Sequence, residues 1–227
     1  MTNSAPQSSP LVKGKLFAGL DDAALREIYK AAQVRSFAAQ EVITVKGDRP
    51  DHLLLLLSGR AQAYTLTEAG SEILLSWIVP GDIIGLVSLL VKPPAYMAST
   101  TTVTDCEFLV WNHSTIRRLA KAYPQLSENG FKLALYYVGV YMKRHSSILT
   151  KTAESRLAEA LLHLATEAGE VQPTGVAIDI TNEQLSSLSD MSHFTASRLL
   201  SKWERDGKLS KRRGRVTLLA PESFIAA

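Results

Sequence analysis

The hydrophobic and polar positions of the chain follow one rhythm in its first half and another in its second half. From Val34 to Trp111, short runs of β-branched and aliphatic residues are separated by turn sequences such as Ser58-Gly59 and Pro80-Gly81-Asp82. Closely spaced strands with no long helix between them are typical of an antiparallel barrel or sandwich. The runs that we expect to form strands are Val34–Phe37, Val42–Val45, Leu53–Leu57, Ala61–Leu66, Ile73–Val79, Ala98–Thr104 and Phe108–Trp111.

Helical spacing of the apolar residues appears on both sides of this strand region. The residues Asp21–Gln33 have the pattern of a short amphipathic helix, with two aspartates at its start. A second helix is expected over Ser114–Ala122, and Pro124 begins a longer one that runs to about Lys151. Antiparallel strands combined with separate helices indicate the α+β class.

The long helix carries apolar residues on two sides. One set repeats at intervals of 4, 3, 4, 3 and 4 residues, which is a heptad pattern. The second stripe contains Leu133, Tyr137, Val140 and Ile148. A helix that is apolar on two sides must be covered on two sides, so we expect its own β-domain on one side and the same helix of a second copy on the other. A helix buried inside a monomer is the alternative. The expected dimer seam consists of Phe131, Leu135, Val138, Met142, His145 and Leu149.

The C-terminal part has the pattern of two short helices followed by a hairpin. Thr181 and Gln184 fit a capping box at the start of the first helix, and Ser192 can cap the second, His193–Arg205. A tight break at Asp190-Met191 separates them. A capped helix, a tight turn, a second helix and a basic hairpin describe a winged helix-turn-helix. The other elements expected here are a helix over Ser155–Thr166, a strand over Val176–Ile180 and a hairpin from Leu209 to Leu219.

The charge of the chain is concentrated in this C-terminal part. The net charge is +3, but residues 193–215 contain eight cations and two acidic residues, so this stretch alone carries +6 and the rest of the chain −3. A solvated surface is the alternative, but next to a helix-turn-helix the excess favours nucleic-acid binding. Arg198 could donate two hydrogen bonds to a guanine, and the other cations could contact phosphates. The residues that we expect at the DNA are Ser192, His193, Phe194, Thr195, Ser197, Arg198, Lys202, Lys211, Arg212, Arg213 and Arg215.

Composition excludes several classes of protein. Hydrophobic residues make up 46% of the chain and charged residues 21%, which is ordinary for a globular protein. The single Cys106 cannot form an internal disulfide, and with no signal peptide or membrane span in the sequence it indicates a cytoplasmic protein without a membrane partner. We expect Met1–Lys15 to be a disordered tail. The sequence has no nucleophile elbow, Walker loop, HExxH or CxxC motif, so we expect no enzyme, no catalytic residue and no metal site.

Several stretches in this order resemble the CRP/FNR family of transcription regulators. They are Gly59-Arg60-Ala61, Pro80-Gly81-Asp82-Ile83-Ile84-Gly85, Pro124-Gln125-Leu126, Ser155-Arg156-Leu157-Ala158, Thr181-Asn182-Glu183-Gln184-Leu185 and Thr195-Ala196-Ser197-Arg198-Leu199-Leu200. The resemblance implies a β-roll or jelly-roll effector domain over 16–123, a dimerisation helix over 124–151 and a winged helix-turn-helix domain over 152–227. It also implies a homodimer on a pseudo-palindromic double-stranded DNA site, with RNA polymerase as a further partner.

One position in the second helix departs from the family pattern. The family commonly has a glutamate three residues before the serine that corresponds to Ser197, and Phe194 stands there in this chain. A phenyl ring cannot accept a hydrogen bond from cytosine N4, but it can pack against a thymine methyl group. We therefore expect a half-site that differs from the usual one at that base.

The effector region also departs from the family pattern. Members that bind cyclic nucleotides carry Gly-Glu followed by Arg-Ser/Thr-Ala, whose arginine neutralises the phosphate. Here Leu86 follows Gly85, the second motif is Tyr96-Met97-Ala98, and no arginine lies between Gly85 and Ile116. A buried phosphate without a bidentate cation would be costly, so we expect that the effector is not a cyclic nucleotide. The expected effector pocket, which would suit a neutral or aromatic ligand or be filled by its own rings, consists of Gly85, Leu86, Tyr96, Met97, Ala98, Tyr137 and Tyr141.

Two alternatives to this function remain open from the sequence. Haem would need axial ligands, for which His52, His113, His145 and Cys106 are the candidates. Cys106 can also be a buried apolar residue, and the sequence identifies no cofactor. The other alternative is a ligand-sensing module whose C-terminal helices contact proteins in place of DNA.

Overall fold

The computed structural model describes residues 14–68, 70 and 72–224. Most of the expected N-terminal tail lies outside these residues, as does the end of the chain. Of the tail, Lys15 begins the 3₁₀ helix η1, Lys15–Phe17. The chain forms two compact units: the first contains residues up to Ala61 together with Ile78–Tyr136, and the second contains Gln62–Trp77 together with the residues from Tyr137 onward.

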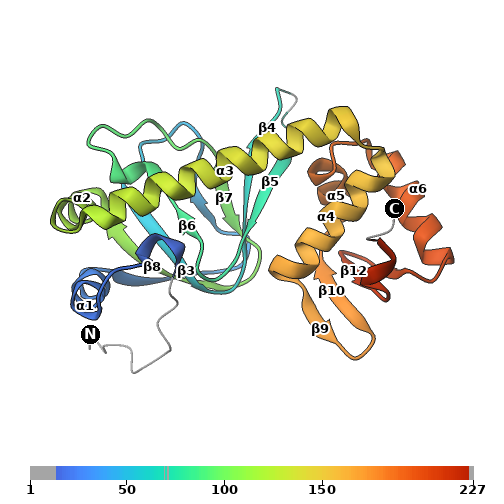
Figure 1. Cartoon of the computed structure of the whole chain (residues 1–227), viewed down its shortest axis with the longest axis horizontal. Coiled ribbons are helices and arrows are strands. Elements are labelled where there is room, and N and C mark those ends of the chain that lie inside the picture. Colours follow the sequence, from blue (N-terminus) through green and yellow to red (C-terminus); the bar gives the residue numbers. More distant parts are fainter. Residues whose placement is uncertain (1–13, 69, 71, 225–227) are drawn as a thin grey trace. The chain divides into compact units, whose positions relative to one another are not determined.

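The strands are antiparallel, as the alternation of apolar runs and turns predicts. One four-stranded sheet has the order β1-β8-β3-β6, and a second has the order β2-β7-β4-β5 (Figure 1). In the first sheet, Leu54 of β3 pairs with Val110 of β8 on one side and with Ile84 of β6 on the other. The strands are β1 Gln33–Phe37, β2 Val42–Thr44, β3 His52–Ser58, β4 Ala61–Leu66, β5 Glu72–Ile78, β6 Ile83–Ile84, β7 Ser99–Thr102 and β8 Cys106–Asn112.

Helices cover the first sheet and complete the core of the first unit. These helices are η1, α1 Asp22–Lys30, η2 Leu86–Leu89, α2 His113–Ala122 and the start of α3 Pro124–Thr150. Trp111 of β8 is fully buried, and its Nε1 donates a hydrogen bond to the Ile28 carbonyl at 2.8 Å. Asn129 of α3 is also buried, and its Nδ2 donates to the carbonyls of Leu16 and Ala18 at 2.8 Å. These bonds satisfy polar groups that would otherwise be costly to bury.

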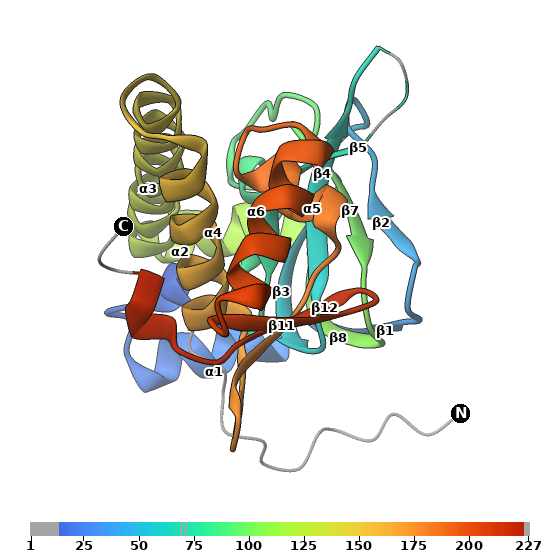
Figure 2. The same cartoon turned by 90° about the vertical axis from the view of Figure 1, so that its right-hand side faces the viewer.

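The second unit contains a three-helix arrangement and a small sheet. The sheet has the order β11-β12-β10-β9 with antiparallel pairing, and α6 contacts β11 (Figure 2). Besides most of β4 and β5 and the part of α3 from Tyr137, the elements are α4 Ala153–Ala168, β9 Glu170–Gln172, β10 Gly175–Asp179, α5 Asn182–Leu188, α6 His193–Arg205, β11 Leu209–Arg212, β12 Arg215–Leu218 and the 3₁₀ helix η3 Pro221–Phe224. The α+β class, the antiparallel strands, the long helix and the helix-turn-helix with its hairpin are therefore as predicted.

Five short elements are not among those predicted, namely η1, β6, η2, β9 and η3. β6 has two residues and exists through its pairing with Leu54 and Leu55 of β3, which a local pattern cannot reveal. η2 has four residues and β9 has three. α1 ends at Lys30, earlier than expected, because the chain enters β1 at Gln33. No helix among the described residues is long and apolar enough to cross a membrane.

Candidate nucleic-acid interface

Local hydrogen bonds cap the N-terminal ends of both α5 and α6. The capping box at α5 is present, with Thr181 Oγ1 accepting from the Gln184 amide and Gln184 Oε1 accepting from the Thr181 amide. At α6, Ser192 Oγ accepts a hydrogen bond from the Thr195 amide at 3.2 Å. Both caps satisfy amides that a helix cannot pair internally. The side of α6 that faces the unit is apolar and buried, and consists of Ala196, Leu199, Leu200 and Trp203.

The opposite side of α6 is exposed at its N-terminal end. Phe194 is 85% exposed, and its ring lies edge-on to the ring of His193, with 6.2 Å between the centroids. Arg198 is exposed one turn further on, and Thr195 and Ser197 are half-buried. The hydroxyls of Ser192 and Thr195 lie 2.9 Å apart and are engaged with each other. The structure therefore presents His193, Phe194 and Arg198 together at one helix end.

Lys208 is half-buried and donates to the Ser223 carbonyl, and the other seven cations of residues 193–215 fall into two groups. Three of them are paired with carboxylates of the same unit. Lys202 Nζ lies 2.9 Å from Glu154 Oε1, and Lys211 Nζ lies 3.3 Å from Glu204 Oε2. Arg215 is paired with Glu170 and Asp179. These three residues were expected at the DNA, and each now has a competing internal partner.

The paired carboxylates show the effect of these cations. The hydrogen bond from Lys202 lowers the pKa of Glu154, with the nearby charge acting in the same direction. A hydrogen bond from the Lys211 backbone amide lowers the pKa of Glu204. Both carboxylates therefore stay ionised at neutral pH and hold their partner lysines.

The second group of cations is exposed and has no ion pair among the described residues. It consists of Arg198, Arg205, Arg212 and Arg213. Arg212 and Arg213 lie at the tip of the β11–β12 hairpin, where Gly214 takes a φ of +72° that L-residues rarely adopt. The tip of the hairpin therefore carries positive charge that is available to an external anion.

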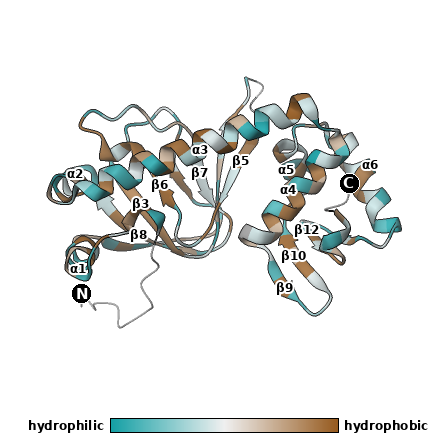
Figure 3. Ribbon diagram, viewed as in Figure 1, coloured by the Kyte–Doolittle hydropathy of each residue, from teal (hydrophilic) through white to brown (hydrophobic). Residues whose placement is uncertain are grey.

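The expected dimer seam is an exposed apolar face in the single chain. Large parts of Phe131, Leu135, Val138, Met142 and Leu149 are exposed, and His145 is exposed among them. Apolar colour recurs along α3 (Figure 3). By contrast, Leu133 of the second stripe is buried against the first unit. A row of large apolar side chains left in water over several turns is unusual on a monomer and marks an interaction surface.

The expected effector residues are divided between the two units. In the first unit, the ring of Tyr96 packs against Gly85, and its hydroxyl donates to the His52 carbonyl at 3.2 Å. Burial raises the pKa of Tyr96. Leu86 and Ala98 are half-buried, whereas Met97 is 76% exposed. Tyr137 and Tyr141 lie on the part of α3 that belongs to the second unit.

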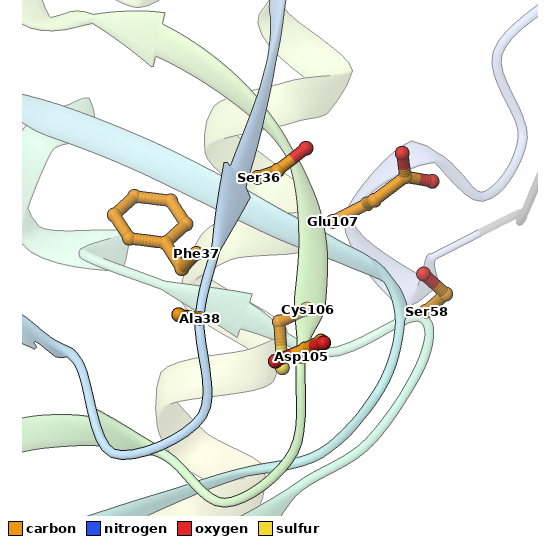
Figure 4. Close-up of a pocket in the computed structure, with 7 residues that line it drawn as sticks. All are labelled: Ser36, Phe37, Ala38, Ser58, Asp105, Cys106 and Glu107. Atoms are coloured by element: carbon orange, nitrogen blue, oxygen red, sulfur yellow. The ribbon is translucent and has the colours of Figure 1, made fainter.

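Two of the haem-ligand candidates, Cys106 and His113, have partners of their own. Cys106 is buried, its thiol donates to the carbonyls of Arg60 and Thr104 at 3.3 Å, and burial raises its pKa. It borders a cavity of about 370 Å³ (Figure 4). His113 Nε2 lies 3.0 Å from the Leu90 carbonyl. The part of the chain that the structure describes has no cluster of three or more His, Cys, Asp or Glu side chains that could hold a metal ion. The cavity is lined by Ser36, Phe37, Ala38, Ser58, Asp105, Cys106 and Glu107.

Two arginines at the helix-turn-helix were missed by the sequence analysis. Arg144 of α3 and Arg156 of α4 both bind the turn between α5 and α6. Arg156 stands in a stretch that resembles a family motif, but nothing in that motif assigns it this role. The sequence feature that could have revealed Arg144 is its partner Asp190. Asp190 occupies a tight turn with a positive φ, a conformation that glycine adopts at lower cost.

Comparison with known proteins finds similarity over nearly the whole chain. Residues 34–123 match the cyclic nucleotide-binding domain and residues 155–226 match the Crp-like helix-turn-helix domain. The CRP-like cAMP-activated global transcriptional regulator of Mycobacterium tuberculosis is 22% identical over 218 residues, which are 95% of this chain and 96% of that protein. Two solved structures share the fold. FixK2 from Bradyrhizobium japonicum has a TM-score of 0.72 at 17% identity and covers 86% of this chain and 96% of its own. The c-di-GMP responsive global regulator CLP of Xanthomonas campestris has a TM-score of 0.67 at 21% identity and covers 87% and 99%.

Proposed function

The chain belongs to the CRP/FNR family of transcription regulators, and from this premise we propose that it acts as a homodimer on a pseudo-palindromic DNA site. The family consists of DNA-binding regulators and not of enzymes. Two α6 helices, one from each copy, would enter the major groove at half-sites about 34 Å apart. RNA polymerase is the protein partner that this function implies, and we expect the protein to act in the cytoplasm.

The observation that carries the proposal is the exposed N-terminal end of α6. Phe194 and Arg198 are exposed there, while Leu199, Leu200 and Trp203 hold the opposite side in the core. The guanidinium of Arg198 can donate two parallel hydrogen bonds to guanine O6 and N7. Arg212 and Arg213 at the hairpin tip can contact phosphates, which supply affinity without reading sequence.

The second part of the proposal is that α3 joins the two copies. The exposed face from Phe131 to Leu149 follows a heptad pattern, so the same face of a second copy is its natural partner. Isologous pairing of this kind generates the two-fold symmetry that a pseudo-palindromic site requires.

We further propose that the effector is not a cyclic nucleotide, although the M. tuberculosis relative is cAMP-activated. Tyr96 uses its hydroxyl on the His52 carbonyl, and Met97 and Leu86 offer neither a cation nor a carboxylate. Lys92 is the only lysine or arginine between Gly85 and Ile116, and it is exposed. Isothermal titration with cAMP, cGMP and cyclic di-GMP should therefore give no saturable heat. Binding of any of them in the micromolar range would overturn this part of the proposal.

DNA binding is tested by measuring affinity across a series of salt concentrations. Fragments selected from random DNA provide the site, and fluorescence anisotropy gives the dissociation constant. We expect the logarithm of the association constant to fall linearly with the logarithm of the salt concentration. The slope should become shallower by about 0.9 for each phosphate contact removed, and therefore by about 1.8 when each protomer of the dimer loses one contact. Arg212→Ala and Arg213→Ala should reduce the slope and weaken all sequences equally, whereas Arg198→Ala should weaken the selected site most. If no DNA is bound at any salt concentration, the alternative of a protein-contacting module is favoured.

A further inference from the structure

The turn between α5 and α6 is held in an unusual backbone conformation. Asp190 has a φ of +50°, and Gln40 is the only other non-glycine residue in the described part of the chain with a positive φ. Aspartate can adopt this left-handed backbone conformation, but at a steric cost that glycine avoids. Ser192, which caps α6, follows two residues later. The conformation of Asp190 therefore sets the direction in which α6 begins.

The side chain of Asp190 is bound by an arginine of the long helix. Arg144 Nε lies 2.8 Å from Asp190 Oδ2, and Arg144 Nη2 lies 2.9 Å from Oδ1. The same Nη2 also donates to the Ser187 carbonyl. The two charged side chains are only 23% and 28% exposed. A planar guanidinium that binds both oxygens of a carboxylate fixes distance and orientation, which a single lysine contact cannot do.

A second arginine binds only the backbone of this turn. Arg156 of α4 donates from Nε to the Ser189 carbonyl at 2.9 Å and from Nη2 to the Asp190 carbonyl at 3.0 Å. Its Nη1 donates to the Lys151 carbonyl at 3.0 Å. Arg156 therefore fixes the shape of the turn from α4, whereas Arg144 ties it to α3 through a side chain. Arg144 therefore connects the turn to the helix that carries the expected dimer seam, through the Asp190 carboxylate and the Ser187 carbonyl.

We propose that Arg144 and Asp190 are positioning residues, whose ion pair locks the start of α6 to α3. The strained turn is kept because aspartate supplies the carboxylate that a glycine lacks. In a dimer joined along α3, this pair would set the direction of both reading helices and hence the fit to two half-sites. The consequence for DNA rests on the function proposed above, whereas the lock itself is a property of the single chain.

The lock is tested by hydrogen–deuterium exchange of the full-length protein, measured by mass spectrometry on peptides that cover residues 187–195. The variants are Arg144→Met, Asp190→Gly and the double variant. Asp190→Gly allows the positive φ without strain and removes the carboxylate that Arg144 binds. Lys143→Met removes an exposed neighbouring cation and is the matched control. We expect both single variants to lose protection in this segment, Arg144→Met at least as much as Asp190→Gly because it also loses the bond to the Ser187 carbonyl. The double variant should lose no more than Arg144→Met, because the same pair is broken in each case.

Several outcomes of the exchange experiment would overturn the lock. These are unchanged protection in Arg144→Met, additive losses in the double variant, or an equal loss in Lys143→Met. Arg144→Lys provides a second variant if Arg144→Met folds poorly. It keeps the positive charge but cannot bind both carboxylate oxygens in the way the planar guanidinium does. Its protection should therefore lie between that of the wild type and that of Asp190→Gly. A protection equal to that of the wild type would mean that the contact of Arg144 with both oxygens of Asp190 has no role.

The positioning role is tested on the same variants with the selected DNA site. We expect Arg144→Met and Asp190→Gly each to weaken specific binding by about fivefold or more, with melting temperatures close to that of Lys143→Met and with the salt slope unchanged, because no phosphate contact is lost. If protection falls but affinity does not, the positioning role is wrong. If the wild type binds no DNA at all, the proposed function fails, and the exchange result still decides whether the lock exists.

Discussion

At the scale of single residues, the exposed Phe194 gives the most specific prediction about the proposed DNA site. It is 85% exposed at the end of α6 and stands where the family commonly has a glutamate. A phenyl ring offers only apolar contact, and the thymine methyl group is the apolar feature of the major groove. The base next to Phe194 should therefore be thymine.

Exchanging this residue should change the base preference. We expect Phe194→Glu to shift the selected base from thymine to cytosine, because a carboxylate accepts a hydrogen bond from cytosine N4. Phe194→Ala should lose about 1–3 kcal/mol of discrimination at this base and leave the other positions unchanged. Selection from random DNA followed by sequencing measures all three proteins. Identical half-sites for wild type and Phe194→Glu would show that this residue does not contact a base.

Sequence reasoning at this scale predicted which residue types gather at α6, but not which of them are occupied elsewhere. Lys202, Lys211 and Arg215 were expected to contact DNA on their position alone. Their carboxylate partners include Glu154, 48 residues away from Lys202, and Glu170, 45 residues away from Arg215. Only the fold brings such distant residues together, so their pairing is not visible in the local pattern. The exposure of Phe194 and Arg198, by contrast, follows from the helical spacing of their neighbours.

Releasing Lys202 from its partner should strengthen binding to DNA of any sequence. Glu154→Gln removes the carboxylate that holds Lys202 and also removes its repulsion of phosphates. We expect tighter binding at low salt and a salt slope steeper by about 0.9 per protomer, since one more phosphate contact forms. Anisotropy titrations on selected and on random DNA measure both. Glu159→Gln is the control and should change neither value. Like Glu154, Glu159 lies in α4, and its carboxylate is paired with Lys151.

The same ion pair has a defined pH dependence. Because the pKa of Glu154 is lowered in the folded protein by its hydrogen bond from Lys202, its stabilising effect is present above the ordinary glutamate pKa. The effect is lost as the pH falls through the lowered value. Wild type and Glu154→Gln should therefore differ in unfolding free energy at neutral pH and converge in acid. A difference that is constant with pH would exclude the pair as its cause.

At the scale of elements, long patterns were predicted well and short ones were not. The heptad spacing in α3, the caps of α5 and α6, and the alternation in β3 and β8 each follow from many residues or from a specific cap. β6 consists of two residues that depend on pairing with β3, and no local pattern distinguishes such a strand from a loop. The sequence of α3 shows two apolar stripes but not which of them faces the core. In the structure, Leu133 faces the core and Leu135 faces outward.

These two neighbouring leucines provide a test of what each stripe does. Leu133 is 8% exposed and Leu135 is 54% exposed. Leu133→Ala should lower the unfolding free energy by about 2–5 kcal/mol, because it leaves a cavity in the core. Leu135→Glu should leave the helix content unchanged and convert the dimer to a monomer, because it places a charge in the seam. Sedimentation velocity and thermal unfolding followed by circular dichroism measure both variants. A Leu135→Glu protein that keeps the wild-type mass would show that this face is not the dimer contact.

At the scale of the whole molecule, the chain combines an antiparallel β-unit with a helix-turn-helix unit, and α3 contributes residues to both. The order of these parts could be predicted because each has its own pattern and the motifs occur in a fixed sequence. Neither the lock between Arg144 and Asp190 nor the division of the hairpin cations could be predicted, because both depend on contacts between distant elements. DNA recognition by a dimer would use features from every scale: Phe194 and Arg198, the caps of α6, and the pairing of two α3 helices.

The mass of the protein–DNA complex shows how many chains bind one site. A duplex that carries the selected site is mixed with the protein at low salt, and the complex is weighed by native mass spectrometry. A homodimer on a pseudo-palindromic site should give two chains per duplex in one cooperative step. This complex should be lost when Leu135→Glu separates the chains. A single chain per duplex with undiminished affinity would contradict the proposed homodimer, as would a Leu135→Glu protein that binds as tightly as the wild type.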